Sequence, residues 1–163
     1  PVYAQHVDPF EQGRATGFIL PESLVSAGAV GSLLNHSEHK LKFTTIKETV
    51  LRCHELGLKL IICAANLKEA QKIKALRPYA IAFEDPALVA TGKAISTHNS
   101  TDVKEFVAIL EGSGIIPLCG AGISNPEDVK AALDLGCKGV LVASAVANSQ
   151  APEKFLKEIS GLF

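Results

Sequence analysis

A single acid, Glu84, stands where an apolar stretch of the sequence changes character. The residues before it, Tyr79 to Phe83, form an apolar run typical of a buried parallel strand, and small residues dominate the loop pattern after it. Enzymes built on parallel strands often carry a catalytic carboxylate at the carboxyl end of a strand, beside a loop that closes over the substrate. Glu84 is therefore a candidate general base. The alternative is an ordinary strand-end acid that faces solvent.

His36 is the second candidate, because it follows a predicted strand in the sequence NHSEHK. We expect Ser37 to cap a helix that begins at Glu38 and His39. The partial positive charge at the amino end of a helix would disfavour the imidazolium form and leave a neutral N–H donor, which can polarise a carbonyl group. A structural histidine is the alternative, and we assign this role to His39, His54 and His98.

Small residues occupy the ends of two further predicted strands. GAGIS follows one strand and contains Gly120, Ala121 and Gly122, and the next strand ends in Ala143 and Ser144. Bare backbone N–H groups at the start of a helix can bind phosphate, and the loops after the last two strands of an α/β barrel are the usual place for such a site. The alternative for GAGIS is a tight turn followed by a helix cap.

The composition excludes several functional classes. The 163 residues, 47% of them hydrophobic, can bury the core of one domain, and we expect residues 1–163 to form a single domain. The net charge of -1 provides no overall field to attract nucleic acid or an anionic membrane. No apolar run is long enough to span a membrane, and we expect no leader before the first predicted strand. We therefore expect a cytoplasmic protein.

The cysteines and strand ends predict neither a metal site nor a nucleophile triad. The four cysteines are scattered without a CxxC pair, which indicates reduced thiols in the core rather than disulfides or a zinc site; they are Cys53, Cys63, Cys119 and Cys137. No serine or cysteine stands at a strand end with a histidine and an acid arranged to activate it.

Strand and helix patterns alternate along the whole chain, which indicates a parallel sheet with right-handed crossovers. We expect strands at residues 1–6, 29–34, 58–64, 79–83, 115–119 and 139–143. Helices are expected between them, with Asn66 and Asn125 as N-caps, and one terminal helix is expected after Ser144.

Two α/β architectures share this alternation, the doubly wound open sheet and the (β/α)8 (TIM) barrel. A dinucleotide-binding sheet carries GxGxxG after its first strand, whereas GAGIS follows the fifth strand and lacks the third glycine. A complete barrel has about 250 residues and rarely fewer than about 200, so this length fits a barrel that lacks two strands. We predict a barrel that is incomplete at the N-terminus. The opening at Pro1 in a strand pattern, without Met, leads us to expect missing residues before it.

Five motifs resemble the triosephosphate isomerase family, most closely its short archaeal type. They are AQHVDPFEQGRATGFILPE, GSLLNHSEHKLKF, FEDPALVATGK, LCGAGIS and GVLVASAV, and they occur in the family's order and spacing. The resemblance covers essentially the whole chain, from the family's third strand to its eighth. No single motif is unique, but five motifs in register are highly specific.

The resemblance implies interconversion of glyceraldehyde 3-phosphate and dihydroxyacetone phosphate through an enediolate, a step of glycolysis and gluconeogenesis, without cofactor or metal. Glu84 matches the family's base, His36 its neutral electrophile, and Glu38 the acid that supports the catalytic network. The match also assigns phosphate binding to the lid at residues 86–92, with Ala90 and Gly92, and to the two later loops, with Gly120, Ala121, Gly122, Ala143 and Ser144.

The resemblance also bears on partners. Gln5 and Thr16 match positions that pack near a neighbouring subunit, and the archaeal type implies a homo-oligomer, either a tetramer or a dimer. The expected ligand is a small triose phosphate, and no nucleic acid or membrane partner is expected.

The sequence departs from the family pattern at three places. Ala90 replaces a lid glycine, and Asp85 replaces the proline that usually follows the base. The family's strand-1 lysine and its companion asparagine would precede Pro1, and neither Lys93 nor Lys138 stands at an equivalent strand end. Without that cation, we expect this chain alone to be poorly active or inactive.

Three functional hypotheses remain open from the sequence. The first is a triosephosphate isomerase. The second is a non-catalytic or split chain that keeps the phosphate-binding scaffold and exposes sheet edges. The third is another phosphate-binding barrel, such as an enzyme of amino-acid biosynthesis, although that class does not predict NHSE followed by FEDPALVATG.

Overall fold

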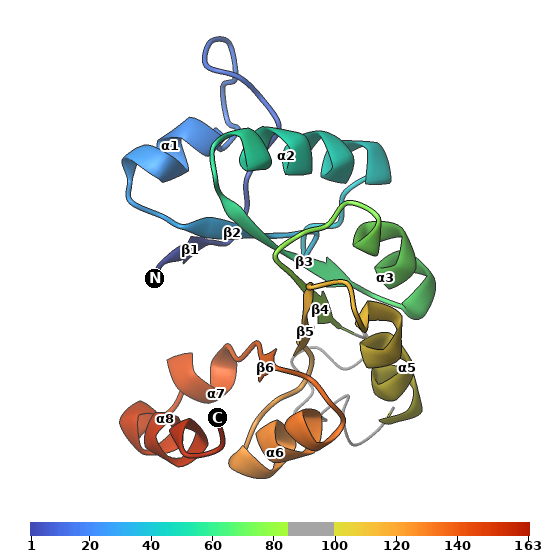
Figure 1. Ribbon diagram of the computed structural model, residues 1–163. Helices are drawn as coiled ribbons and strands as arrows, with labels where there is room; N and C mark the ends of the chain where they lie inside the picture. Colours follow the sequence, from blue (N-terminus) through green and yellow to red (C-terminus); the bar gives the residue numbers. More distant parts are fainter. Residues whose placement is uncertain (85–99) are drawn as a thin grey trace.

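A curled parallel sheet organises the chain (Figure 1). The computed structural model describes residues 1–84 and 100–163. In this part of the chain, six strands form one sheet and are ordered in space as in the sequence. The strands are β1 (Tyr3–Ala4), β2 (Gly31–Leu34), β3 (Lys59–Ala64), β4 (Ala80–Phe83), β5 (Ile116–Cys119) and β6 (Gly139–Val140). Every neighbouring pair is parallel, as the alternating pattern predicted.

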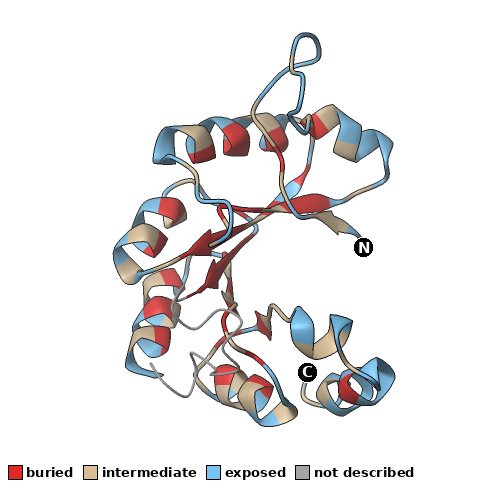
Figure 2. Ribbon diagram, turned by 180° about the vertical axis from the view of Figure 1, so that it is seen from behind, coloured by how far each residue is buried: buried red, intermediate tan, exposed pale blue. Residues whose placement is uncertain are grey.

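The helices lie on the outer side of the sheet, which curves into an arc that stays open between β1 and β6 (Figures 1 and 2). They are α1 (Pro21–Ser26), α2 (Phe43–Glu55), α3 (Leu67–Lys74), α5 (Ser100–Leu110), α6 (Pro126–Asp134), α7 (Ser144–Ala147) and α8 (Pro152–Ser160). This arrangement confirms the predicted α/β barrel that is incomplete.

The core lies between the sheet and the helices. All four residues of β4 are buried, and the Phe83 ring stacks on Phe106 of α5 with ring centroids 5.0 Å apart. Figure 2 shows the buried residues concentrated on the strands and on the helix faces that meet them. Because both faces of β4 are covered, its sequence is continuously apolar instead of alternating.

Local signals fix several helix starts. The Asn66 side chain accepts a hydrogen bond from the backbone N–H of Glu69, and Asn125 accepts one from that of Asp128, so both predicted N-caps are confirmed. Pro126 stands at the start of α6, where its missing N–H costs nothing.

Two predicted helices differ from the structure. No helix begins at Glu38: residues 36–39 form a turn closed by the His39 N–H and the His36 carbonyl at 2.9 Å, and α2 begins only at Phe43. The predicted terminal helix is interrupted, because Pro152 holds Ala151 outside the helical region (φ -141, ψ 62) and separates α7 from α8.

Two expectations about the chain's chemistry can be compared with the described residues. None of the four cysteines forms a disulfide and all are buried, in agreement with the prediction of core thiols. Within residues 1–84 and 100–163, no helix combines the length and the apolar character needed to cross a bilayer.

Candidate active site

Glu84 lies at the carboxyl end of β4 and is buried. Its residue exposure is 2%, and its backbone N–H donates to the Ala64 carbonyl at 2.9 Å, which continues the pairing of β3 with β4. The alternative of a solvent-facing strand-end acid is therefore wrong. A carboxylate taken out of water needs hydrogen-bond donors, and the neighbouring loop and strand provide them.

His36 lies against Glu84. Its Nε2 is 3.3 Å from Glu84 Oε1, and the backbone N–H of Ser37 donates to Glu84 Oε2 at 3.2 Å. The loop after β2 thus supplies two groups to one carboxylate, although residue 36 precedes residue 84 by a long stretch of chain. The parallel sheet brings them together because both follow strands at the same edge.

The backbone determines which nitrogen of His36 carries the proton in the neutral ring. The Glu38 N–H donates to Nδ1 at 3.3 Å, so Nδ1 uses its lone pair as an acceptor. The proton then lies on Nε2, which faces Glu84. The sequence analysis attributed the neutral N–H donor of His36 to the amino end of a helix, and this reason is wrong because residues 36–39 form a turn. A single backbone N–H contacts the ring instead.

The Glu38 side chain is mostly in solvent. It is 83% exposed, and its Oε2 lies 3.6 Å from His36 Nδ1. The carboxylate therefore lies on the far side of the imidazole ring from Glu84, near the nitrogen that already accepts the backbone N–H.

Cys63 contributes to the site, which the sequence did not indicate. Burial, followed by the negative charge of Glu84, raises the pKa of the Cys63 thiol, which lies near the Glu84 carboxylate. The signal was available in the strand period: Cys63 is aligned with Ala82, and Glu84 stands two residues beyond Ala82, on the same face.

The glycine loop after β5 borders Glu84 directly. The Gly120 N–H donates to the Phe83 carbonyl at 2.9 Å, and a Cβ built on Gly120 would lie 3.3 Å from Glu84 Oε1. Gly122 has φ 71, a conformation that favours glycine. The small residues therefore allow backbone to approach the carboxylate closely.

The turn-and-cap alternative for GAGIS describes part of this loop. Ser124 donates its N–H and its hydroxyl to Asp128 Oδ2, each at 2.9 Å, and Asn125 caps α6. These bonds fix the end of the loop at the helix and leave the glycine segment beside Glu84.

The end of β6 is adjacent to the glycine loop. The Leu141 N–H donates to the Cys119 carbonyl at 2.8 Å, so that the chain segments leading to Gly120 and to Ala143 run side by side. Ala143 and Ser144 are exposed. The predicted lid residues Ala90 and Gly92, together with Asp85, Lys93 and His98, lie outside the described residues.

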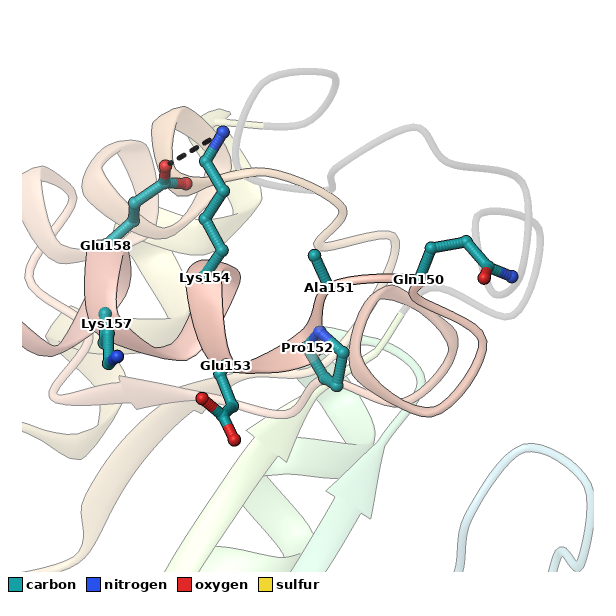
Figure 3. A pocket seen from close by; sticks show the side chains of 7 residues that line it. All are labelled: Gln150, Ala151, Pro152, Glu153, Lys154, Lys157 and Glu158. Atoms are coloured by element: carbon teal, nitrogen blue, oxygen red, sulfur yellow. Dashed lines mark ion pairs between the residues drawn. The ribbon is translucent and has the colours of Figure 1, made fainter.

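The described residues contain no cluster of three or more histidine, cysteine, aspartate or glutamate side chains that could hold a metal ion. A surface hollow of about 650 Å³ lies at the start of α8. Figure 3 shows and labels the side chains that line it, between Gln150 and Glu158. This hollow does not include Glu84, His36 or Gly120.

The fold, together with the pair of Glu84 and His36, defines an incomplete parallel α/β barrel with a buried acid and a histidine at the carboxyl ends of its strands. The family model described as "Triosephosphate isomerase" matches residues 1–160. The chain belongs to the triosephosphate isomerase family. This membership decides against the reading as a different phosphate-binding barrel.

Archaeal relatives named triosephosphate isomerase support the assignment. The chain is 43% identical to the protein of Sulfurisphaera tokodaii over 159 residues, which cover 97% of this chain and 69% of the relative. It is 42% identical to that of Methanocaldococcus jannaschii over 161 residues, 98% of this chain and 74% of the relative. The protein of Methanopyrus kandleri is 42% identical over 164 residues, which cover 99% of this chain and 73% of the relative.

Proposed function

We propose that this chain carries the acid–histidine part of a triosephosphate isomerase site and acts on glyceraldehyde 3-phosphate and dihydroxyacetone phosphate. One observation carries the proposal: the Nε2 of His36 and the Oε1 of buried Glu84 lie 3.3 Å apart. A base and a neutral donor this close can act on two adjacent carbons of one small substrate.

The proposed reaction moves hydrogen between the two carbons. The Glu84 carboxylate removes a proton from C1 of dihydroxyacetone phosphate, the C–H bond breaks, and its electrons form the C1–C2 double bond of an enediolate. Negative charge moves to the C2 oxygen, toward which His36 Nε2–H donates a hydrogen bond. The hydroxyl proton then passes from O1 to O2 through the imidazole, and Glu84 returns its proton to C2 to give the aldehyde.

The backbone around Glu84 supports this role. The Ser37 N–H donates to the carboxylate at 3.2 Å and the Cys63 thiol lies near it, so the carboxylate is held in place beside His36. We assign the substrate phosphate to the loop of Gly120, Ala121 and Gly122, in which the Gly120 N–H already donates to the Phe83 carbonyl, to the loop of Ala143 and Ser144, and to Ala90 and Gly92 of the lid. A bound phosphate would then lie beside the base, because Gly120 borders Glu84.

The test is a coupled assay with dihydroxyacetone phosphate. The chain is measured alone and mixed with the part of the Sulfurisphaera tokodaii protein that the match does not cover. We expect turnover in the mixture and little or none in the chain alone, where no strand-1 lysine is present. Glu84→Gln removes the base at nearly constant volume and should abolish turnover in the mixture, while inorganic phosphate still binds.

The mixture also separates the two remaining hypotheses. A non-catalytic scaffold predicts that supplying the uncovered part restores nothing, whereas phosphate binding persists. An enzyme predicts that activity appears with the added part and disappears with Glu84→Gln.

We also propose a homo-oligomer. Phe10 and Phe18 are exposed by 40% and 50%, and their rings pack together in a tilted arrangement (interplanar angle 49°) with centroids 4.3 Å apart in the loop between β1 and α1. Such an apolar pair on a projecting loop is typical of a contact surface. Light scattering after size-exclusion chromatography measures the mass, and a monomer at all concentrations would contradict the proposal.

A further inference from the structure

The Asn35 side chain fixes both ends of the loop that carries His36. Asn35 directly precedes His36, is 1% exposed and has φ 59, a left-handed conformation that turns the chain sharply after β2. Its Oδ1 accepts the Leu41 N–H at 3.0 Å, which closes the loop from residue 35 to residue 41. Its Nδ2 donates to the Cys63 carbonyl at 2.8 Å, which anchors the closed loop to the end of β3.

Glu69 of α3 also binds the Asn35 carboxamide, through the same Nδ2 group that donates to Cys63. Glu69 Oε1 accepts from Asn35 Nδ2 at 3.0 Å, and its Oε2 accepts from the Ala65 N–H at 2.7 Å. The carboxylate therefore joins the loop after β2 to the loop after β3. The side chain is 23% exposed, so these bonds form in a partly dry environment where hydrogen bonds to a charged group are strong.

Lys40 completes the network from within the same loop. Its Nζ donates to both Glu69 oxygens, at 2.9 and 3.0 Å, and to the Asn35 carbonyl at 3.4 Å. The ammonium group thus neutralises Glu69 and adds a second link between the loop and α3. None of the contacts of Glu69 or Lys40 involves His36 or Glu84 directly.

We propose that Asn35, Lys40 and Glu69 form a positioning network that sets the distance between His36 and Glu84, so that Glu69 controls the chemical step from outside the site. Cys63 of β3 links the two parts of the site: its carbonyl accepts from Asn35 at 2.8 Å, and its side chain lies on the same face as Glu84, because Cys63 is aligned with Ala82. A displacement of the loop relative to β3 therefore changes the place of His36 relative to the base. The effect on the reaction rests on the function proposed above.

The main test compares Glu69→Ala with Glu22→Ala. Glu22 of α1 is a matched control, because its side chain is also 23% exposed and forms an ion pair with Arg52 in the helix layer. We expect Glu69→Ala to lower kcat of the active mixture by about tenfold to a hundredfold with KM changed less than about twofold, since misplaced groups lose chiefly transition-state stabilisation. Glu22→Ala should leave kcat unchanged at temperatures where both variants are folded.

Two further variants separate the parts of the network. Asn35→Gly keeps the left-handed backbone accessible but removes the carboxamide, and should lower kcat as Glu69→Ala does. Glu69→Gln keeps an oxygen acceptor of the same shape and should recover most of the lost kcat. The network would be overturned if Glu69→Gln lowered kcat as much as Glu69→Ala does while Asn35→Gly left kcat unchanged.

A readout independent of turnover keeps this inference separate from the proposed function. The His36 ring resonances are followed by NMR in protein with ¹⁵N-labelled histidine and are assigned with His36→Gln. We expect them to move or broaden in Glu69→Ala and Asn35→Gly but not in Glu22→Ala. Unchanged resonances in Glu69→Ala would overturn the positioning role. Moved resonances with no effect of His36→Ala on turnover would support the positioning role and overturn the proposed function.

Discussion

The ring nitrogens of His36 have different partners, and this difference determines what the side chain can do. Nδ1 accepts a backbone N–H, and Nε2 faces the buried Glu84 carboxylate at 3.3 Å. A ring held in this way presents an N–H donor without requiring a positive charge. The donor is most useful where negative charge develops on a substrate oxygen.

Replacement of His36 by alanine should therefore affect the transition state more than substrate binding. We expect His36→Ala to lower kcat in the active mixture by about a hundredfold or more, with a smaller change in KM. His54→Ala, on the exposed side of α2, is the control and should have neither effect. Steady-state kinetics with dihydroxyacetone phosphate measures both constants. Equal losses in kcat and in affinity would indicate simple substrate binding by His36.

The thiols give a second prediction. Burial raises the pKa of Cys53 to about 11, and burial together with the charge of Glu84 raises that of Cys63. The hydrogen bond with Cys119, followed by burial, raises that of Cys137. Because only the thiolate reacts, an aromatic disulfide reagent at pH 8 should modify these three thiols slowly in the folded protein and rapidly in urea. Rapid native-state reaction of Cys63 would contradict its place beside Glu84.

The close packing of β2 between β1 and β3 requires a residue without a Cβ at position 31. A Cβ on Gly31 would lie 1.9 Å from the Lys59 carbonyl oxygen and 2.6 Å from Cε1 of Tyr3. We expect Gly31→Ala to destabilise the fold by about 1–3 kcal/mol or more, because the clash involves backbone that cannot move aside. Gly161→Ala is the control, since no atom lies within 4 Å of its Cβ position. Equal denaturation midpoints for the two variants would contradict the packing of β2 between β1 and β3.

The link between the loop after β2 and α3 should depend on pH. Burial raises the pKa of Glu69, but bonds from the Ala65 N–H, Lys40 and Asn35 outweigh it and lower the pKa below its usual 4.5. The folded state therefore binds this proton less readily than the unfolded state, and the stabilisation is present above about pH 4.5 and is lost as the pH falls through the folded pKa.

The measurement is the free energy of unfolding of the wild type and of Glu69→Gln between pH 7 and pH 3. We expect the wild type to be more stable near neutral pH and the difference to shrink below about pH 4.5. Lys130→Met is a control for loss of an exposed ion pair, since Lys130 pairs with Asp134 on the surface of α6. A difference between wild type and Glu69→Gln that does not change with pH would contradict the ionised Glu69 link.

The molecule as a whole is an arc with two sheet edges. Within the described residues, β1 and β6 each have one neighbouring strand, and the gap between them is visible in Figures 1 and 2. The chain spans 69% to 74% of the length of the relatives described above. Val2 beside β1 is 69% exposed, so an added strand at this edge would cover apolar surface.

The sequence predicted those features whose causes are local. Asn66 and Asn125 cap their helices through bonds that reach only three residues along the chain, and the six strands were visible as apolar runs. The loop after β2 was predicted wrongly as a helix start, because its shape depends on bonds from Asn35 to Cys63 and Glu69, 28 and 34 residues away. Distant contacts of this kind leave no periodic pattern in the sequence.

In the candidate site, too, the sequence predicted the residues with local signals and missed those that depend on distant contacts. Glu84 and His36 were found because each follows an apolar strand, and the barrel topology implies that strand ends meet. Cys63 was assigned to the core alone, because its place on the same face as Glu84 follows from the strand register, which aligns Cys63 with Ala82, and not from its sequence neighbours. The network of Asn35, Lys40 and Glu69 likewise becomes visible only when the loops after β2 and β3 are placed side by side.

The most direct test of the account is hydrogen exchange at C1 of dihydroxyacetone phosphate in D₂O, followed by proton NMR. Exchange reports removal of the proton by the base even when product is not released. We expect the active mixture to replace the C1 hydrogen with deuterium and the mixture with the Glu84→Gln variant to leave it in place. Exchange at the same rate in Glu84→Gln, or no exchange with wild-type protein in the mixture, would contradict it.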